Sequence, residues 1–155
     1  MPFDANLVLI DGTKTFTAAT AASFVAATST TRESTNTGAA VIDLKGTGEK
    51  GLAAVLIIPV LATATDYLTM LIEGSEEEAF GESVYYNKTL VVFNKAGVTD
   101  GRILASECTA GLIVVQRFAT ELRYVRAKGI PTVGNSTGTF GTLQVLLSPY
   151  PFTLL

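Results

Sequence analysis

Histidine is absent from this 155-residue sequence, and Cys108 is its only cysteine. The absence of histidine excludes a Ser-His-Asp triad, a Cys-His pair and every metal site that uses histidine. One cysteine forms no internal disulfide, and without a histidine partner we interpret Cys108 as a small apolar residue in a reducing compartment. A Ser-Lys or Thr nucleophile stays open from the residues alone, but no spacing of Asp or Glu favours a carboxylate dyad. We therefore expect no enzyme, and no metal or cofactor.

Charge is also scarce, because only 16% of the residues are charged whereas 48% are hydrophobic. The net charge of -3 argues against nucleic-acid binding, which needs clustered Lys and Arg. Arg117, Arg123, Arg126 and Lys128 come closest to a basic cluster, and we interpret them as a solvated strand edge rather than an anion site. A surface so poor in charge suits burial in an assembly.

Long hydrophobic runs are missing as well. The longest one, residues 52–64, is shorter than the roughly 20 residues that span a bilayer, and it contains Pro59. Residues 1–6 lack the positive charge and the apolar stretch of a signal peptide. We expect a soluble protein without a membrane segment or a visible export signal.

Two local motifs invite a functional interpretation. Residues 46–51, GTGEKG, satisfy the spacing of the dinucleotide fingerprint, which works only where the glycines open a helix. The β-rich run that follows, with Pro59, favours a turn between two strands instead. The acidic run 76–78 is interpreted as a solvated turn, with a cation site as the alternative.

Short β-like segments separated by turn-forming residues fill the rest of the chain. The expected strands are residues 6–10, 14–18, 39–44, 52–61, 67–73, 84–93, 102–105, 112–118, 122–128 and 143–148. In and around the last of these, Leu143, Val145 and Leu147 lie on one face and Thr142, Gln144 and Ser148 on the other, as a half-buried strand requires. Segments 122–128 and 142–148 flank a linker of turn formers and are predicted to be a pair of strands. The Thr- and Ala-rich residues 18–31 are predicted to be an arm or loop, and the whole chain to be one all-β domain.

Several segments together resemble the capsid cement, or decoration, proteins of tailed bacteriophages. The resemblance rests, in order along almost the whole chain, on residues 4–9, the Thr/Ala-rich arm, residues 41–44, 46–49, 68–73, 79–80, 123–127 and 142–146. It implies a jelly-roll-like antiparallel β-sandwich that spans residues 1–155, with terminal arms at 1–5 and 149–155. It also implies a protein made in the bacterial host cytoplasm that resides on the exterior of the virion capsid. Its partners would be the major capsid protein and itself, as a homodimer or homotrimer.

The termini and the basic residues of 122–128 are the candidate contacts for such an assembly. Apolar chain ends are unusual, because free termini are normally polar. The candidate interface residues are Pro2, Phe3, Arg123, Arg126, Lys128, Tyr150, Phe152, Leu154 and Leu155. The apolar tail alternatively packs on its own domain. The alternative functions are another phage structural part, such as a tail-tube or head-completion protein, and a sugar-binding β-sandwich.

Overall fold

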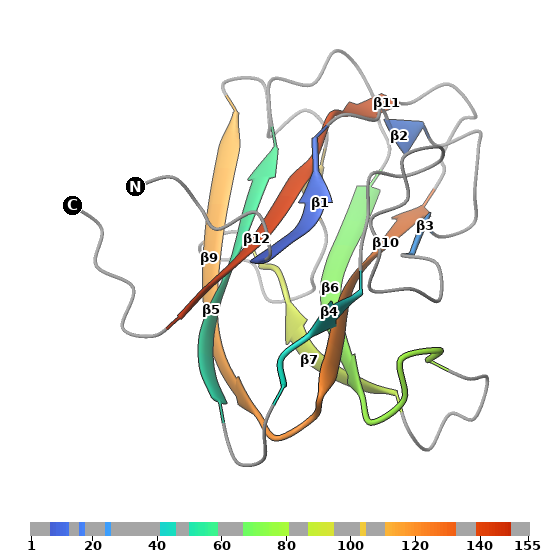
Figure 1. Cartoon of the computed structure of the whole chain (residues 1–155). Coiled ribbons are helices and arrows are strands. Elements are labelled where there is room, and N and C mark those ends of the chain that lie inside the picture. Colours follow the sequence, from blue (N-terminus) through green and yellow to red (C-terminus); the bar gives the residue numbers. More distant parts are fainter. Residues whose placement is uncertain are drawn as a thin grey trace.

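The computed structural model of the chain consists of β-strands (Figure 1). The structure describes residues 7–12, 16–17, 24–25, 41–45, 50–58, 67–80, 87–94, 103–104, 111–132 and 139–149. The strands are β1 (Val8–Asp11), β2 (Phe16–Thr17), β3 (Phe24–Val25), β4 (Ile42–Asp43), β5 (Lys50–Ile58), β6 (Tyr67–Ser75), β7 (Lys88–Val92), β8 (Ile103–Leu104), β9 (Leu112–Thr120), β10 (Tyr124–Thr132), β11 (Thr139–Gly141) and β12 (Gln144–Pro149). Each of the ten segments predicted from the sequence overlaps one of these strands, so the all-β class is confirmed.

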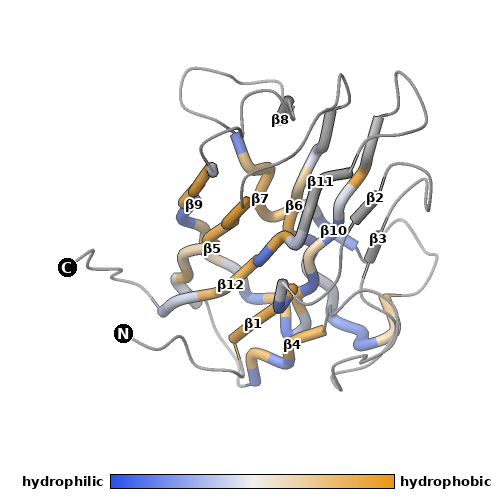
Figure 2. The backbone as a smooth tube through the Cα atoms, turned by 90° about the horizontal axis from the view of Figure 1, so that it is seen from above, coloured by the Kyte–Doolittle hydropathy of each residue, from blue (hydrophilic) through white to orange (hydrophobic). Residues whose placement is uncertain are grey.

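Two larger antiparallel sheets form the body of the described structure. The first sheet has the order β1-β12-β5-β9. The second has the order β3-β10-β6-β7, with β4 also paired to β10 and β8 to β6. A small third sheet pairs β11 with β2. Viewed from above, the strands of the first sheet lie on one side and β6, β7 and β10 on the other (Figure 2).

The core lies between the two larger sheets and is built by alternate residues of each strand. As predicted, Val145 and Leu147 of β12 and the preceding Leu143 are buried. The other large contributors, drawn from both sheets, are Leu9, Ile10, Leu52, Leu56, Ile58, Met70, Ile72, Val91, Phe93, Val114 and Val125. Each such side chain contributes roughly 1.5–3 kcal/mol by leaving water.

A bulge in β1 explains how two consecutive residues enter this core. The pairing of β1 with β12 shifts register between Val8 and Ile10, and both Leu9 and Ile10 are buried. The chain then turns at Gly12, whose φ of 77° lies in the left-handed region that favours glycine. A side chain at this position would also meet Gln144 of β12.

The two strands at the end of the chain do not pair with each other as the sequence suggested. β10 belongs to the second sheet and pairs with β6, whereas β12 lies in the first sheet between β1 and β5. β10 also continues through Pro131 to Thr132, inside the predicted linker, and β11 lies at the end of that linker. Pro149, predicted to begin the C-terminal arm, is instead the last residue of β12 and pairs with Leu52.

The structure also bears on two predictions for the N-terminal half of the chain. Within the Thr/Ala-rich segment, β3 pairs with β10, so an arm or loop is wrong at Phe24–Val25. After the glycine motif, the chain enters β5 rather than a helix, so the dinucleotide fingerprint lacks the helix that it needs. The predicted turn at residues 46–49 lies outside the described residues. In the part that the structure describes, no helix is long and apolar enough to cross a membrane.

Candidate interaction site

Three strands that are distant in sequence meet in the second sheet and bring their charged residues together. β10 pairs with β6 along its whole length and with β4 at Tyr124 and Val125. Because residues alternate between faces, Val125 points into the core, while its neighbours Tyr124 and Arg126 lie on the opposite face. We call the resulting group the charged cluster, which consists of Asp43, Glu73, Phe80, Arg123, Tyr124, Arg126 and Lys128.

Glu73 is the buried acidic member of the charged cluster. It lies directly across from Arg126 in the pairing of β6 with β10. Its Oε2 accepts a hydrogen bond from Arg126 Nε at 2.9 Å and lies 2.8 Å from Arg126 Nη2. Its Oε1 accepts a hydrogen bond from Lys128 Nζ at 3.2 Å. A carboxylate removed from water needs such partners, so these two cations compensate its burial.

Phe80 fixes the other side of the Arg126 guanidinium. The Arg126 Cζ atom lies 4.2 Å from the centre of the Phe80 ring, a cation-π contact. The turn at the acidic run positions this ring, because Phe80 N donates a hydrogen bond to Glu77 O at 3.1 Å. Glu76 and Glu77 are exposed, which confirms the predicted solvated turn. Arg126 is thus held between a carboxylate and an aromatic ring, and its side chain is only 12% exposed.

Asp43 and Arg123 form the exposed part of the charged cluster. Arg123 Nε donates to Asp43 Oδ1 at 3.0 Å, and Nη2 donates to Oδ2 at 2.8 Å, a bidentate pair. The hydrogen bond from Arg123, helped by the backbone N–H of Lys45 at 2.9 Å, lowers the pKa of Asp43 to about 2. The same hydrogen bond raises the pKa of Arg123. The backbone joins the two segments as well, since Leu44 N donates to Arg123 O at 2.8 Å.

The structure corrects the prediction that residues 122–128 form a solvated strand edge. β10 is an internal strand, with β6 on one side and β4 and β3 on the other. The three basic side chains of residues 122–128, Arg123, Arg126 and Lys128, are each paired with a carboxylate of the same chain. Arg123 is 53% exposed and Lys128 is 28% exposed, so these two remain accessible to a partner.

The remaining candidate interface residues lie outside the described part of the chain. These are Pro2, Phe3, Tyr150, Phe152, Leu154 and Leu155. The carboxylates Asp43 and Glu73 and the ring of Phe80 were not singled out from the sequence. A signal for Glu73 was present, because it ends an otherwise apolar strand segment and a carboxylate there requires a nearby cation.

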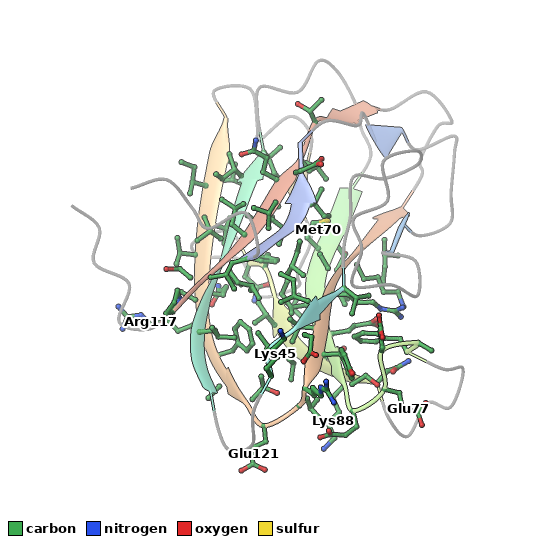
Figure 3. The ribbon with its side chains drawn as sticks, viewed as in Figure 1. Lys45, Met70, Glu77, Lys88, Arg117 and Glu121 are labelled. Carbon is green, nitrogen blue, oxygen red and sulfur yellow. The ribbon has the colours of Figure 1, made fainter. Side chains whose placement is uncertain are left out.

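Further charged side chains lie outside the cluster. Glu121 and Lys88 lie at the lower end of the view, Glu77 lies to their right, and Lys45 lies higher, near the middle (Figure 3). Within the described residues, no group of three or more Cys, Asp or Glu side chains is placed to hold a metal ion. These side chains therefore form a surface of mixed charge suited to polar contacts.

Comparisons with protein-family models, with curated proteins and with solved structures find no significant match to this chain.

Proposed function

We propose that this chain is a bacteriophage capsid cement, or decoration, protein. It binds the outside of the icosahedral head and bridges neighbouring major capsid subunits, which stabilises the shell without any turnover. The proposed fold is a jelly-roll-like variant of the antiparallel β-sandwich, and the two larger sheets with their shared core support this class of architecture.

The proposal rests mainly on one observation: three segments that resemble cement proteins meet at one surface. Residues 41–44, 68–73 and 123–127 are among those that resemble cement proteins, and they contribute β4, β6 and β10. Their charged residues pair with one another in the charged cluster. Such convergence supports a shared surface rather than three unrelated runs of β-sequence.

Within this surface, Arg123 is the residue that we assign to shell contact. Its guanidinium is held in place by Asp43 yet is half exposed, so little side-chain freedom is lost when it binds a second acceptor. Lys128 provides a second, less exposed cation. Acidic groups on the shell are the expected partners, and several weak contacts from one oligomer strengthen one another through effective concentration.

The experiment mixes purified protein with expanded heads that were assembled without it and measures co-sedimentation. The proposal expects saturable binding at a fixed number of copies per head. Heads of an unrelated phage serve as the control and are expected to leave the protein in the supernatant. Absence of binding to its own heads would contradict the proposal and favour another structural part, such as a tail-tube or head-completion protein.

A further inference from the structure

The edges of the two larger sheets differ in how they are protected against pairing with another strand. β1 has four residues and a shift in register, and β7 has five residues, a shift in register in its pairing with β6, and an exposed lysine, Lys88. β3, β4 and β8 have two residues each. Shortness, bulges and lysines are the devices by which natural sheets prevent association at an edge.

β9 has none of these devices. It is nine residues long and pairs with β5 from Leu112 to Thr120 without any shift in register. It contains no proline, and Arg117 is its only charged residue. Within the described part of the chain, β9 pairs with β5 alone and therefore forms one edge of the first sheet. A long, regular and weakly charged edge is a template for strand addition.

The outer face of the first sheet presents apolar residues to this edge. Val8, Leu146, Val55 and Val115 are successive partners across β1, β12, β5 and β9, and they form one row. Leu146 and Val55 in the middle of the row are buried, whereas Val115 at the β9 edge is only half-buried. Further along β9, Ile113 is 68% exposed, an unusual position for a large apolar side chain in a sheet. An apolar row that ends at an unprotected edge gives an added strand side chains to pack against.

We propose that the β9 edge binds β9 of a second copy of this chain, antiparallel and across a two-fold axis at Gln116. This register pairs all nine residues of each strand, because Leu112 then faces Thr120 of the second copy. It joins the two first sheets into one continuous eight-stranded sheet. The proposal concerns association of the chain with itself and does not depend on binding to a shell.

The sequence of β9 is complementary to itself in this register. On the outer face, Ile113 lies over the small side chain of Ala119, and Val115 lies beside the aliphatic part of Arg117. On the core face, Val114 lies beside Phe118, which extends the apolar core of each copy. The two copies of Gln116 face each other, and each amide offers both a donor and an acceptor. An axis at Arg117 would instead oppose two like charges, which is unfavourable.

A pair of substitutions at one position tests both the edge and the register. Val115→Lys would place a lysine opposite Arg117 twice in the dimer, whereas Val115→Glu would place a carboxylate there. Both introduce a charge at the same half-buried site of the monomer, so their effects on folding are closely matched. Val92→Lys on the edge strand β7, where Val92 is 36% exposed, is the control for an added charge at another edge.

Sedimentation velocity of the full chain, as a function of concentration, measures the outcome. The unmodified protein and the Val92→Lys control are expected to have twice the monomer mass of 16.3 kDa. Val115→Lys is expected to weaken dimerisation at least about tenfold, and Val115→Glu to preserve it. A monomeric unmodified protein, or an equal response to Lys and Glu at residue 115, would overturn the proposal.

A disulfide provides a second and independent readout. In a Cys108→Ser background, Gln116→Cys places two cysteines across the proposed axis, at a separation that antiparallel neighbours and disulfides share. Mild oxidation is expected to produce a covalent dimer. Gln144→Cys in the same background lies on the internal strand β12 and is expected to remain monomeric under denaturing conditions. Equal crosslinking at the two positions would contradict the assigned register.

Discussion

Arg123 holds the carboxylate of Asp43 with two hydrogen bonds, although the two residues are 80 positions apart in the sequence. The contact links two parts of the second sheet, because it joins β4 to the residue that precedes β10. It also leaves the Arg123 side chain half exposed. The Asp43–Arg123 ion pair thus stabilises the fold and keeps the accessible guanidinium of Arg123 in a fixed position.

This pair predicts a specific loss of stability in acid. The pKa of Asp43 is lowered to about 2 from 3.8, so the ionised form is stabilised by folding. This stabilisation is fully present above about pH 4 and is lost as the pH falls towards 2. Melting temperatures between pH 7 and 2 should therefore fall more steeply for the unmodified chain than for Asp43→Asn.

The amide of Asp43→Asn retains an acceptor for Lys45 N but loses the charge that Arg123 recognises. Glu76→Gln, in the exposed turn, is the control for removal of one carboxylate and should follow the unmodified protein. Parallel melting curves for the unmodified protein and Asp43→Asn over this pH range would show that the pair does not contribute to acid sensitivity.

The buried pair of Glu73 and Arg126 predicts a strongly non-additive response. Glu73→Gln or Arg126→Met alone leaves a charge with little access to water and should cost about 3 kcal/mol of unfolding free energy. The double variant should recover a substantial part of this loss, because neither buried charge then remains, and Lys128, which is 28% exposed, keeps access to water. Urea denaturation of the four proteins measures the coupling, and strict additivity would contradict it.

Substitutions at two glycines distinguish the cost of backbone strain from the cost of a steric clash. Gly12 and Gly111 have similar positive φ values of 77° and 82°. A Cβ at Gly12 would lie 2.7 Å from Gln144 Cγ, whereas at Gly111 the nearest atom is Ile58 O at 3.6 Å. We expect Gly111→Ala to cost about 1 kcal/mol from backbone strain, and Gly12→Ala to cost more. Equal losses in urea denaturation would mean that Gln144 moves aside freely.

Shell binding should depend on Arg123 more than on an exposed cation outside the charged cluster. Arg123→Ala is expected to weaken co-sedimentation with heads by about tenfold, which corresponds to one charged hydrogen-bonded contact. Lys88→Ala, on β7 and also exposed, removes one cation that belongs to neither the β9 edge nor the charged cluster, so it is the control and should bind as the unmodified protein does. Melting temperatures of both variants identify any loss that comes from folding. An equal loss in both would indicate only a general effect of charge.

The approximate positions of all described strands except β3 and β11 could be predicted from the sequence, but the partners of the strands could not. Alternation identified the buried face of Leu143, Val145 and Leu147, because it depends on each strand alone. Pairing depends on contacts across the chain, and this is why β10 was wrongly placed at an edge and next to β12. Its end was also missed, since Pro131 is normally a strand breaker but here pairs with Leu68.

The charged cluster was only partly predictable for the same reason. Arg123, Arg126 and Lys128 stand close together in the sequence, so their common location followed directly. Their partners Asp43 and Glu73 come from other strands, and only the register of β4 and β6 against β10 brings them close. The predicted free cations therefore turned out to be paired ones.

The rupture temperature of the head, measured with and without the bound protein, tests the cement proposal most directly. A cement protein stabilises the shell by binding its intact form, so the temperature should rise with occupancy and reach a plateau at saturation. Heads should also assemble normally without the protein. If saturated and undecorated heads rupture at the same temperature, the protein does not cement the shell.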